Sequence, residues 1–83
     1  MKPYEIVTEE ELKRSFEGTN FGSAEPRNVI FGTLLKRSCG YHSGYTAEQI
    51  CIELGLITQT AKKLTKLGKE YLYRVVTEIM PVR

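Results

Sequence analysis

The chain has 83 residues, of which 41% are hydrophobic and 27% are charged. Both proportions are close to the average for globular proteins, so the composition gives no case for disorder and predicts one small domain with a single core. No stretch approaches the roughly 18 consecutive apolar residues of a membrane-spanning helix, and the N-terminus lacks the apolar segment of a signal peptide. We therefore expect a cytoplasmic protein that does not bind a membrane.

The net charge of +2 is unevenly distributed along the chain. Residues 1–25 carry three Lys or Arg against six Glu, a balance of −3, whereas residues 26–83 carry nine Lys or Arg against four Glu, a balance of +5. This polarity predicts that an anionic partner approaches the C-terminal two-thirds of the chain.

The two cysteines and the single histidine suggest no chemistry of their own. Cys39 and Cys51 are too few for a secreted disulfide scaffold, and we expect both to be reduced. With His42 they supply three zinc ligands but no fourth, and no third group is placed to orient His42 as a base beside Cys39. We expect no metal, no cofactor and no catalytic site.

The first predicted helix begins at Thr8. Thr8-Glu9-Glu10-Glu11 has the pattern of a capping box, with Thr at the N-cap and Glu at position N3, and Gly18 is placed to end the helix. Residues 1–7 then form an N-terminal extension, and residues 8–80 form the core of the domain.

The second predicted helix reaches Ser38. Ser23 or Glu25 is placed to cap it, and Pro26 suits its first turn. Its apolar positions repeat along one side and are Ile30, Phe31, Leu34 and Leu35. Gly32 inside this helix is less favourable than Ala by about 1 kcal/mol, which a close approach by another helix would explain.

A loop at residues 39–45 joins this helix to the next and contains Tyr41, His42 and Tyr45. In one interpretation these rings form a contact surface for a base, a phosphate or a partner protein. In the other, the loop is a tight connection whose Tyr rings cover the edge of the core. The sequence leaves both interpretations open.

The third predicted helix follows Thr46, which caps it in a second capping box with Gln49 at N3. Gly55 ends the helix in the left-handed conformation. The residues that point inward are Ile50 and Leu54, with Cys51 beside them. The residues left for the other face are Glu48, Ile52 and Glu53.

The chain after Leu56 has two interpretations. In the winged interpretation, residues 56–58 and 63–64 are two short strands joined by a turn, and Thr65 caps the last helix. In the plain helix-turn-helix interpretation, residues 58–67 form a recognition helix. Both remain open.

The last predicted helix runs from Lys66 to Ile79 and ends before Pro81. Its apolar residues form two neighbouring stripes. The first stripe is Leu67, Tyr71, Val75 and Ile79, and the second is Leu72, Val76 and Met80. One stripe suffices for the core, so the other predicts a homodimer through this C-terminal helix.

Two segments resemble a known family. Leu54-Gly55-Leu56-Ile57 and Leu64-Thr65-Lys66-Leu67-Gly68 resemble the exit from the recognition helix and the segment after the wing in MarR-like and PadR-like winged-helix proteins. Together with Gly40-Tyr41-His42-Ser43-Gly44-Tyr45-Thr46, they also resemble small uncharacterised bacteriophage and prophage proteins. The resemblance covers roughly residues 27–75. It implies a mostly α fold, a small winged helix-turn-helix with a short two-stranded β wing, and a phage-derived DNA-binding regulator.

Four lysines after the third helix are the best candidates for nucleic-acid contacts. They lie within eight residues, with no acidic residue among them, and are Lys62, Lys63, Lys66 and Lys69. As phosphate contacts on double-stranded DNA they would give salt-sensitive binding, with Gln49 near a groove. The alternative is a solvated face that keeps the protein soluble.

The predicted recognition helix departs from the DNA-binding pattern, because it carries Glu48 and Glu53 and no Lys or Arg. This favours an alternative function: a protein-interaction module of phage origin that inhibits a host defence or replication protein. Its acidic helix and aromatic loop would bind the partner through Tyr41, His42, Tyr45, Glu48, Ile52 and Glu53. An enzyme is not expected, since no paired carboxylates, activated nucleophile or phosphate-binding loop is present.

Overall fold

The computed structural model describes residues 2–19, 21–22 and 24–79, without the side chain of Ile79. Most of these residues are helical, which confirms the mostly α fold predicted from the sequence. The helices in the described part of the chain are α1 (Pro3–Ile6), α2 (Glu9–Ser15), α3 (Pro26–Ser38), α4 (Tyr45–Glu53) and α5 (Lys66–Ile79). None of them is both long enough and apolar enough to cross a bilayer.

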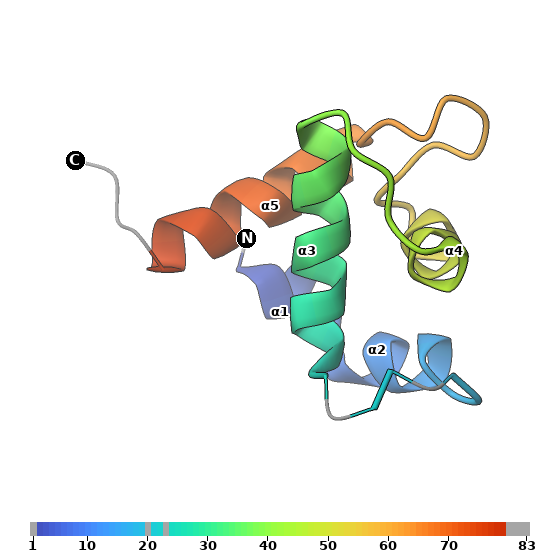
Figure 1. Cartoon of the computed structure of the whole chain (residues 1–83). Coiled ribbons are helices and arrows are strands. Elements are labelled where there is room, and N and C mark those ends of the chain that lie inside the picture. The colour runs from blue at the N-terminus through green and yellow to red at the C-terminus, as the bar shows by residue number, and fades with distance from the viewer. Residues whose placement is uncertain (1, 20, 23, 80–83) are drawn as a thin grey trace.

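Helix α3 stands in the centre of the molecule (Figure 1). It packs against α4 on one side and against α5, which crosses it, and α1 packs against α5. The buried core draws on all of these helices and on the segments between them. Its members are Ile6, Val7, Leu12, Ile30, Leu34, Cys51, Leu56, Ile57 and Tyr71.

The N-terminal residues belong to this core and are not an extension from it. Ile6 and Val7 are only 8% and 1% exposed. The predicted boundary at residue 8 is therefore too late, because the sequence before Thr8 is too short to show a helical period. Burying two such side chains stabilises the fold by about 3 to 5 kcal/mol before the entropy of ordering them is subtracted.

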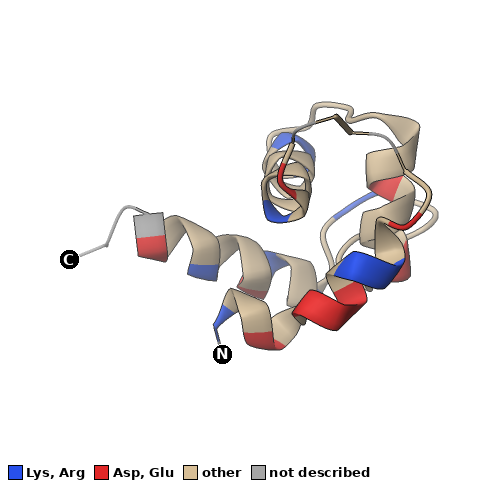
Figure 2. Ribbon diagram, turned by 90° about the horizontal axis from the view of Figure 1, so that it is seen from below, with Lys and Arg blue, Asp and Glu red and all other residues tan. Residues whose placement is uncertain are grey.

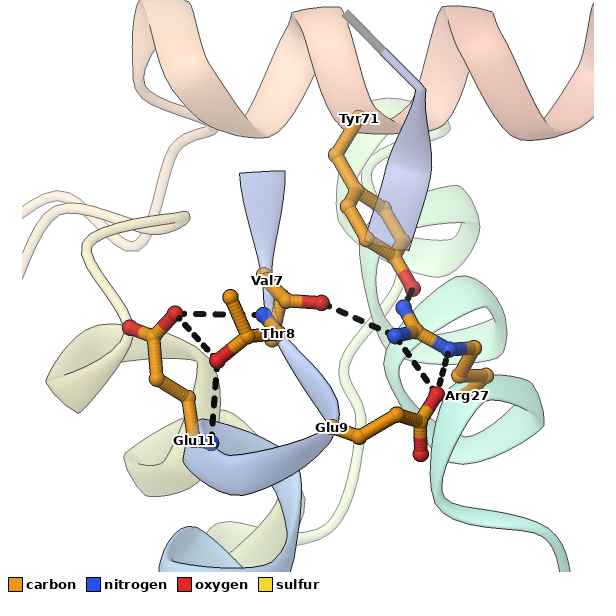
Figure 3. A network of polar contacts seen from close by, with 6 residues as sticks. All are labelled: Val7, Thr8, Glu9, Glu11, Arg27 and Tyr71. Carbon is orange, nitrogen blue, oxygen red and sulfur yellow. Dashed lines mark hydrogen bonds and ion pairs between the residues drawn. The ribbon is translucent and has the colours of Figure 1, made fainter. Parts of the chain in front are cut away.

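A hydrogen-bond network around Arg27 ties the N-terminal segment to the rest of the molecule (Figure 3). Its Nη2 donates to the Val7 carbonyl oxygen and to Glu9 Oε1, both at 2.9 Å, and its Nη1 donates to the Tyr71 hydroxyl at 3.2 Å. The Tyr71 side chain is fully buried. One guanidinium group thus joins α3 to α5 and to the chain around the start of α2.

The first two predicted helices are confirmed with small differences. The Thr8 hydroxyl accepts the Glu11 N–H at 3.2 Å and Glu11 Oε1 accepts the Thr8 N–H at 3.1 Å, as a capping box requires (Figure 3). Helix α2 ends at Ser15, before Gly18. Helix α3 has the predicted bounds, and Glu25 is its N-cap residue without a side-chain cap. The other candidate cap, Ser23, lies outside the described residues.

The close approach expected at Gly32 occurs at a different glycine. A Cβ atom added to Gly32 would have no neighbour within 4 Å, whereas one added to Gly68 would collide with the Leu56 carbonyl oxygen. The start of α5 therefore lies directly against the main chain at Leu56. The expectation for Gly32 is wrong because no atom lies close enough to this position of α3 to exclude a side chain.

The capping box predicted for the third helix is wrong. Helix α4 has Gly44 as its N-cap residue, without a side-chain cap, so Thr46 already lies inside the first turn. The predicted end is confirmed: Gly55 has φ +77°, its N–H donates to the Ile52 carbonyl, and the Leu56 N–H donates to the Cys51 carbonyl at 2.8 Å. These two bonds are those of a Schellman motif.

Residues 58–65 are not helical, so the plain helix-turn-helix interpretation with a recognition helix at 58–67 is wrong. Instead, an antiparallel bridge joins Ile57 to Leu64. The described residues contain no strand longer than this bridge. The segment between them is a turn, and α5 begins after it.

Helix α5 has the predicted bounds and an apolar side. Tyr71 is fully buried, and Leu72 and Val75 are half-buried against the core. Leu67, predicted to share the buried stripe, is 39% exposed, and the residue of the first turn that lies against the core is its neighbour Gly68. The stripe position Met80 lies outside the described residues.

Candidate functional site

The turn at residues 58–63 has a defined main-chain geometry. The Thr58 N–H donates to the Lys63 carbonyl at 2.7 Å, and the Lys63 N–H donates to the Thr58 hydroxyl at 3.1 Å. Lys62 has φ +56°, a left-handed conformation that non-glycine residues seldom adopt. The hydrogen bonds across the base of the turn hold Lys62 in this conformation, so both lysines have fixed main-chain positions.

The start of α5 is fixed on the same segment. The Thr65 hydroxyl donates to the Gly55 carbonyl at 2.6 Å and accepts the Gly68 N–H at 3.0 Å, which confirms Thr65 as the cap of this helix. Because Gly68 has no side chain, the helix can lie against Leu56. Lys66 and Lys69 therefore keep a constant relation to the lysines of the turn.

None of these four lysines has an ion-pair partner in the described structure. Lys63, Lys66 and Lys69 are exposed and Lys62 is half-buried. The ion pairs found in the described residues join Arg27 to Glu9, Arg37 to Glu48 and Arg74 to Glu70, and none includes a lysine of this group. The ammonium groups are thus available to an anionic partner.

An open groove of about 650 Å³ lies between the end of α3, the turn and α5. Its cationic residues are Arg37, Lys63 and Lys69. Its apolar residues are Leu64, Leu72 and Val76, with Tyr73 at 56% exposure beside them. Among the described residues no acidic side chain lines it. Lys62, Lys66 and Gln49 also lie outside it, so the groove contains only part of the predicted site.

Glu48 does not lie on the outer face of α4, where the sequence placed it. Its side chain is 10% exposed and its Oε2 forms a 2.6 Å ion pair with Arg37 Nη2 on α3. The same oxygen accepts the Ser43 N–H at 3.0 Å. The correction follows from helical spacing: Glu48 lies three residues before the fully buried Cys51 and so shares its side of the helix.

This ion pair determines the charge state of Glu48. The bond from Arg37 lowers the pKa of the carboxyl group most, burial opposes this shift, and the Ser43 N–H and the charge of Lys62 lower the pKa further. Glu48 is therefore ionised at neutral pH, and its negative charge is neutralised within the fold by Arg37.

The outer face of α4 is consequently less acidic than predicted. Ile52, also assigned to this face, is half-buried against the core, because it continues the side of the helix that carries Glu48. Gln49 is half-buried and Glu53 is exposed. Of the three helix residues proposed for partner binding, only Glu53 lies fully at the surface.

The aromatic residues of the loop before α4 and of the first position of α4 are exposed to solvent. Tyr41 and Tyr45 are 69% and 78% exposed, and His42 is exposed as well. The interpretation in which these Tyr rings cover the core is therefore wrong. The loop is instead attached to α3 by a polar contact, a 3.3 Å hydrogen bond between the hydroxyl groups of Ser43 and Thr33.

The two cysteines lie in different environments. Cys39 is exposed and Cys51 is fully buried, where burial raises the pKa of its thiol to about 12. A thiol that stays protonated is a poor metal ligand. The described residues contain no group of three His, Cys, Asp or Glu side chains placed to hold a metal ion.

Sequence reasoning missed Arg37 and Tyr73 as members of the groove. The only signal for Tyr73 was its spacing of four residues from Lys69, which places both on one side of a helix. Arg37 gave no signal, because its position depends on how α3 packs against α4. Comparison of the chain with protein-family models, curated proteins and solved structures found no match.

Proposed function

We propose that the protein is a DNA-binding regulator of phage origin that acts by binding and not by catalysis. The observation that carries this proposal is the group of four unpaired lysines, held in fixed positions by the turn and by the first turn of α5. In this proposal α2, α3 and α4 are the three helices of a winged-helix domain, residues 57–64 take the place of the wing, and α5 is the last helix. The resemblance of residues 54–57 and 64–68 to winged-helix proteins supports the same assignment.

The burial of Glu48 removes the main argument against DNA binding. With Glu48 neutralised by Arg37, the outer face of α4 keeps Gln49 and a single exposed acidic residue, Glu53. An amide side chain can form two hydrogen bonds with adenine in the major groove. In this proposal Gln49 contacts base edges, and the lysines of the turn and of α5 contact phosphates.

The number of lysines predicts how steeply DNA binding depends on salt. Four phosphate contacts would give a slope of about −3.6 in a plot of log affinity against log salt, so affinity should fall about 150-fold between 50 and 200 mM salt. We would measure binding of a double-stranded DNA pool by gel shift and anisotropy. A variant with all four lysines changed to Gln should lose this dependence, whereas Lys2→Gln/Lys13→Gln should keep it.

Two results would contradict the proposed binding of DNA through these lysines. If the wild-type protein binds no DNA at 50 mM salt, or if the variant without the four lysines binds with an unchanged slope, the lysines do not serve as phosphate contacts. They are then a solvated face.

The exposed aromatic loop favours a second candidate, a protein-interaction module that inhibits a host protein. Tyr41 and Tyr45 leave most of their surface in solvent, and such rings are common anchors in protein interfaces. With Glu48 buried and Ile52 half-buried, the exposed surface of this module would consist of Tyr41, His42, Tyr45 and Glu53. A host protein retained by the wild type but not by Tyr41→Ala/Tyr45→Ala would support it, and retention of the same proteins by both would contradict it.

A further inference from the structure

The groove beside α5 has a chemical character that DNA binding does not explain. Three of its residues are aliphatic, namely Leu64, Leu72 and Val76, and they line it together with its cationic residues. The end of α3, the turn and the start of α5 meet at the top of the view in Figure 1. We propose that this groove binds an acidic, amphipathic segment of another protein, with carboxylates on the lysines and aliphatic side chains on the apolar floor.

The charges of the groove favour an anionic occupant. Lys63 and Lys69 are exposed and unpaired in the described structure, and no described acidic residue lines the groove with them. Arg37 contributes less, because Glu48 already neutralises it. Two free positive charges at the edge of one concave surface attract and orient a segment that carries Asp or Glu.

The apolar residues of the groove, which form its floor, favour a peptide over a nucleic acid as the ligand. Leu72 is half-buried, as is Val76 one turn later on α5, so both keep surface that a partner can cover. Proteins bind the bases of single-stranded nucleic acids largely by stacking them on aromatic rings, and Tyr73 is the only aromatic residue among the described residues that line the groove. Aliphatic side chains at helical spacing fit such a floor, as they do when an amphipathic helix lies in a groove.

A second copy of this chain does not match the groove. Its helix α2 is acidic only in the first turn, and Lys13 and Arg14 in the last turn offset that charge (Figure 2). The apolar residues Leu12 and Phe16 pack against the core of their own copy and are not free to enter the groove of another. A symmetric contact through α5 would instead bring Lys69 of each copy toward a like-charged groove. This argues against the homodimer through α5 that the sequence suggested, and for a different protein as the occupant.

The test uses synthetic peptides of about 15 residues with Glu on one helical face and Leu at positions i, i+4 and i+7 of the other. Two control peptides keep the Glu residues with Ser in place of Leu, or keep the Leu residues with Gln in place of Glu. Anisotropy should show binding of the first peptide and at least fivefold weaker binding of both controls. Amide NMR shifts on binding should concentrate at Leu64, Lys69 and Val76.

Two matched variants separate this inference from DNA binding, on which it does not rest. Lys63→Gln/Lys69→Gln and Lys62→Gln/Lys66→Gln remove the same charge, but only the first pair lines the groove. The first variant should weaken peptide binding at least fivefold and the second should leave it within twofold. If the proposed DNA binding also holds, both variants should weaken it. Val76→Thr, which keeps the side-chain shape, should weaken peptide binding with little effect on folding.

Four outcomes would overturn the proposal. They are equal binding of the peptide without Leu, equal losses from the two lysine variants, NMR shifts at the groove from a DNA strand but not from the peptide, and a dimer in sedimentation whose interface contains Val76. The first two leave only non-specific attraction, the third assigns the groove to nucleic acid, and the fourth assigns it to a second copy.

Discussion

Charged residues lie both at the junction of α3 with α4 and on the basic turn before α5. The charges at the junction are paired within the fold, whereas those on the turn are not. At the junction, Arg37 and Glu48 are about nine-tenths buried and form an ion pair, with Glu48 also accepting the Ser43 N–H. On the turn and the start of α5, four lysines have no ion-pair partner in the described structure. The first arrangement makes the fold depend on the charges, whereas the second leaves them for a partner. The two regions should therefore respond differently to substitution.

The largest effect is expected at Gly68, which positions the lysines of α5 relative to the turn. Gly68→Ala places a Cβ atom against the Leu56 carbonyl oxygen, so we expect a loss of about 3 kcal/mol in the free energy of unfolding. Gly32→Ala is the matched control, because that helical position is open and Ala should stabilise it by up to about 1 kcal/mol. Urea denaturation measures both, and similar values for the two variants would refute the close approach.

The next largest loss in the free energy of unfolding is expected from a substitution at Glu48. Glu48→Gln keeps an acceptor for the Ser43 N–H but leaves Arg37 as a buried charge without its counter-ion, which should lower the free energy of unfolding by about 2 kcal/mol. Glu53→Gln, on the exposed side of the same helix, should change it by less than about 0.5 kcal/mol. Equal values would show that the ion pair does not contribute to stability.

The same ion pair predicts a smaller dependence on pH. Because the folded state lowers the pKa of Glu48, the unfolded state binds more protons in acid, and stability falls as the pH drops below about 4.5 toward the folded pKa. Glu11, whose pKa the capping bonds from Thr8 lower, contributes in the same direction. Denaturation midpoints from pH 7 to pH 3 should fall more steeply for the wild type than for Glu48→Gln. Parallel curves would contradict the role of Glu48.

The smallest effect on stability is expected where the proposed function lies. Changing Lys63 and Lys69 to Gln should alter the free energy of unfolding by less than about 0.5 kcal/mol, since both side chains are exposed and unpaired in the described structure. Thermal denaturation checks this. A loss above about 1 kcal/mol would mean that these lysines serve the fold, and that the two regions do not differ as proposed.

The sequence by itself determined the features that depend on local spacing. The capping box of Thr8 and Glu11, the bounds of α3 and α5, the left-handed Gly55 and the Thr65 cap each follow from contacts within a few residues. Of the candidate site, the group of four lysines was predicted for the same reason, because a run of residues without acidic neighbours is visible in the chain.

Only the tertiary structure decided which charges are paired and which surfaces are free. Arg37 meets Glu48 because α3 and α4 pack side by side, and residues eleven positions apart reveal no such contact in the sequence. The N-terminal residues are tied to the core through Arg27 of α3, which donates to the Val7 carbonyl oxygen and to the hydroxyl group of Tyr71 on α5. The groove likewise combines side chains from α3, the turn and α5, so its cationic edge and aliphatic floor exist only once these elements are packed together.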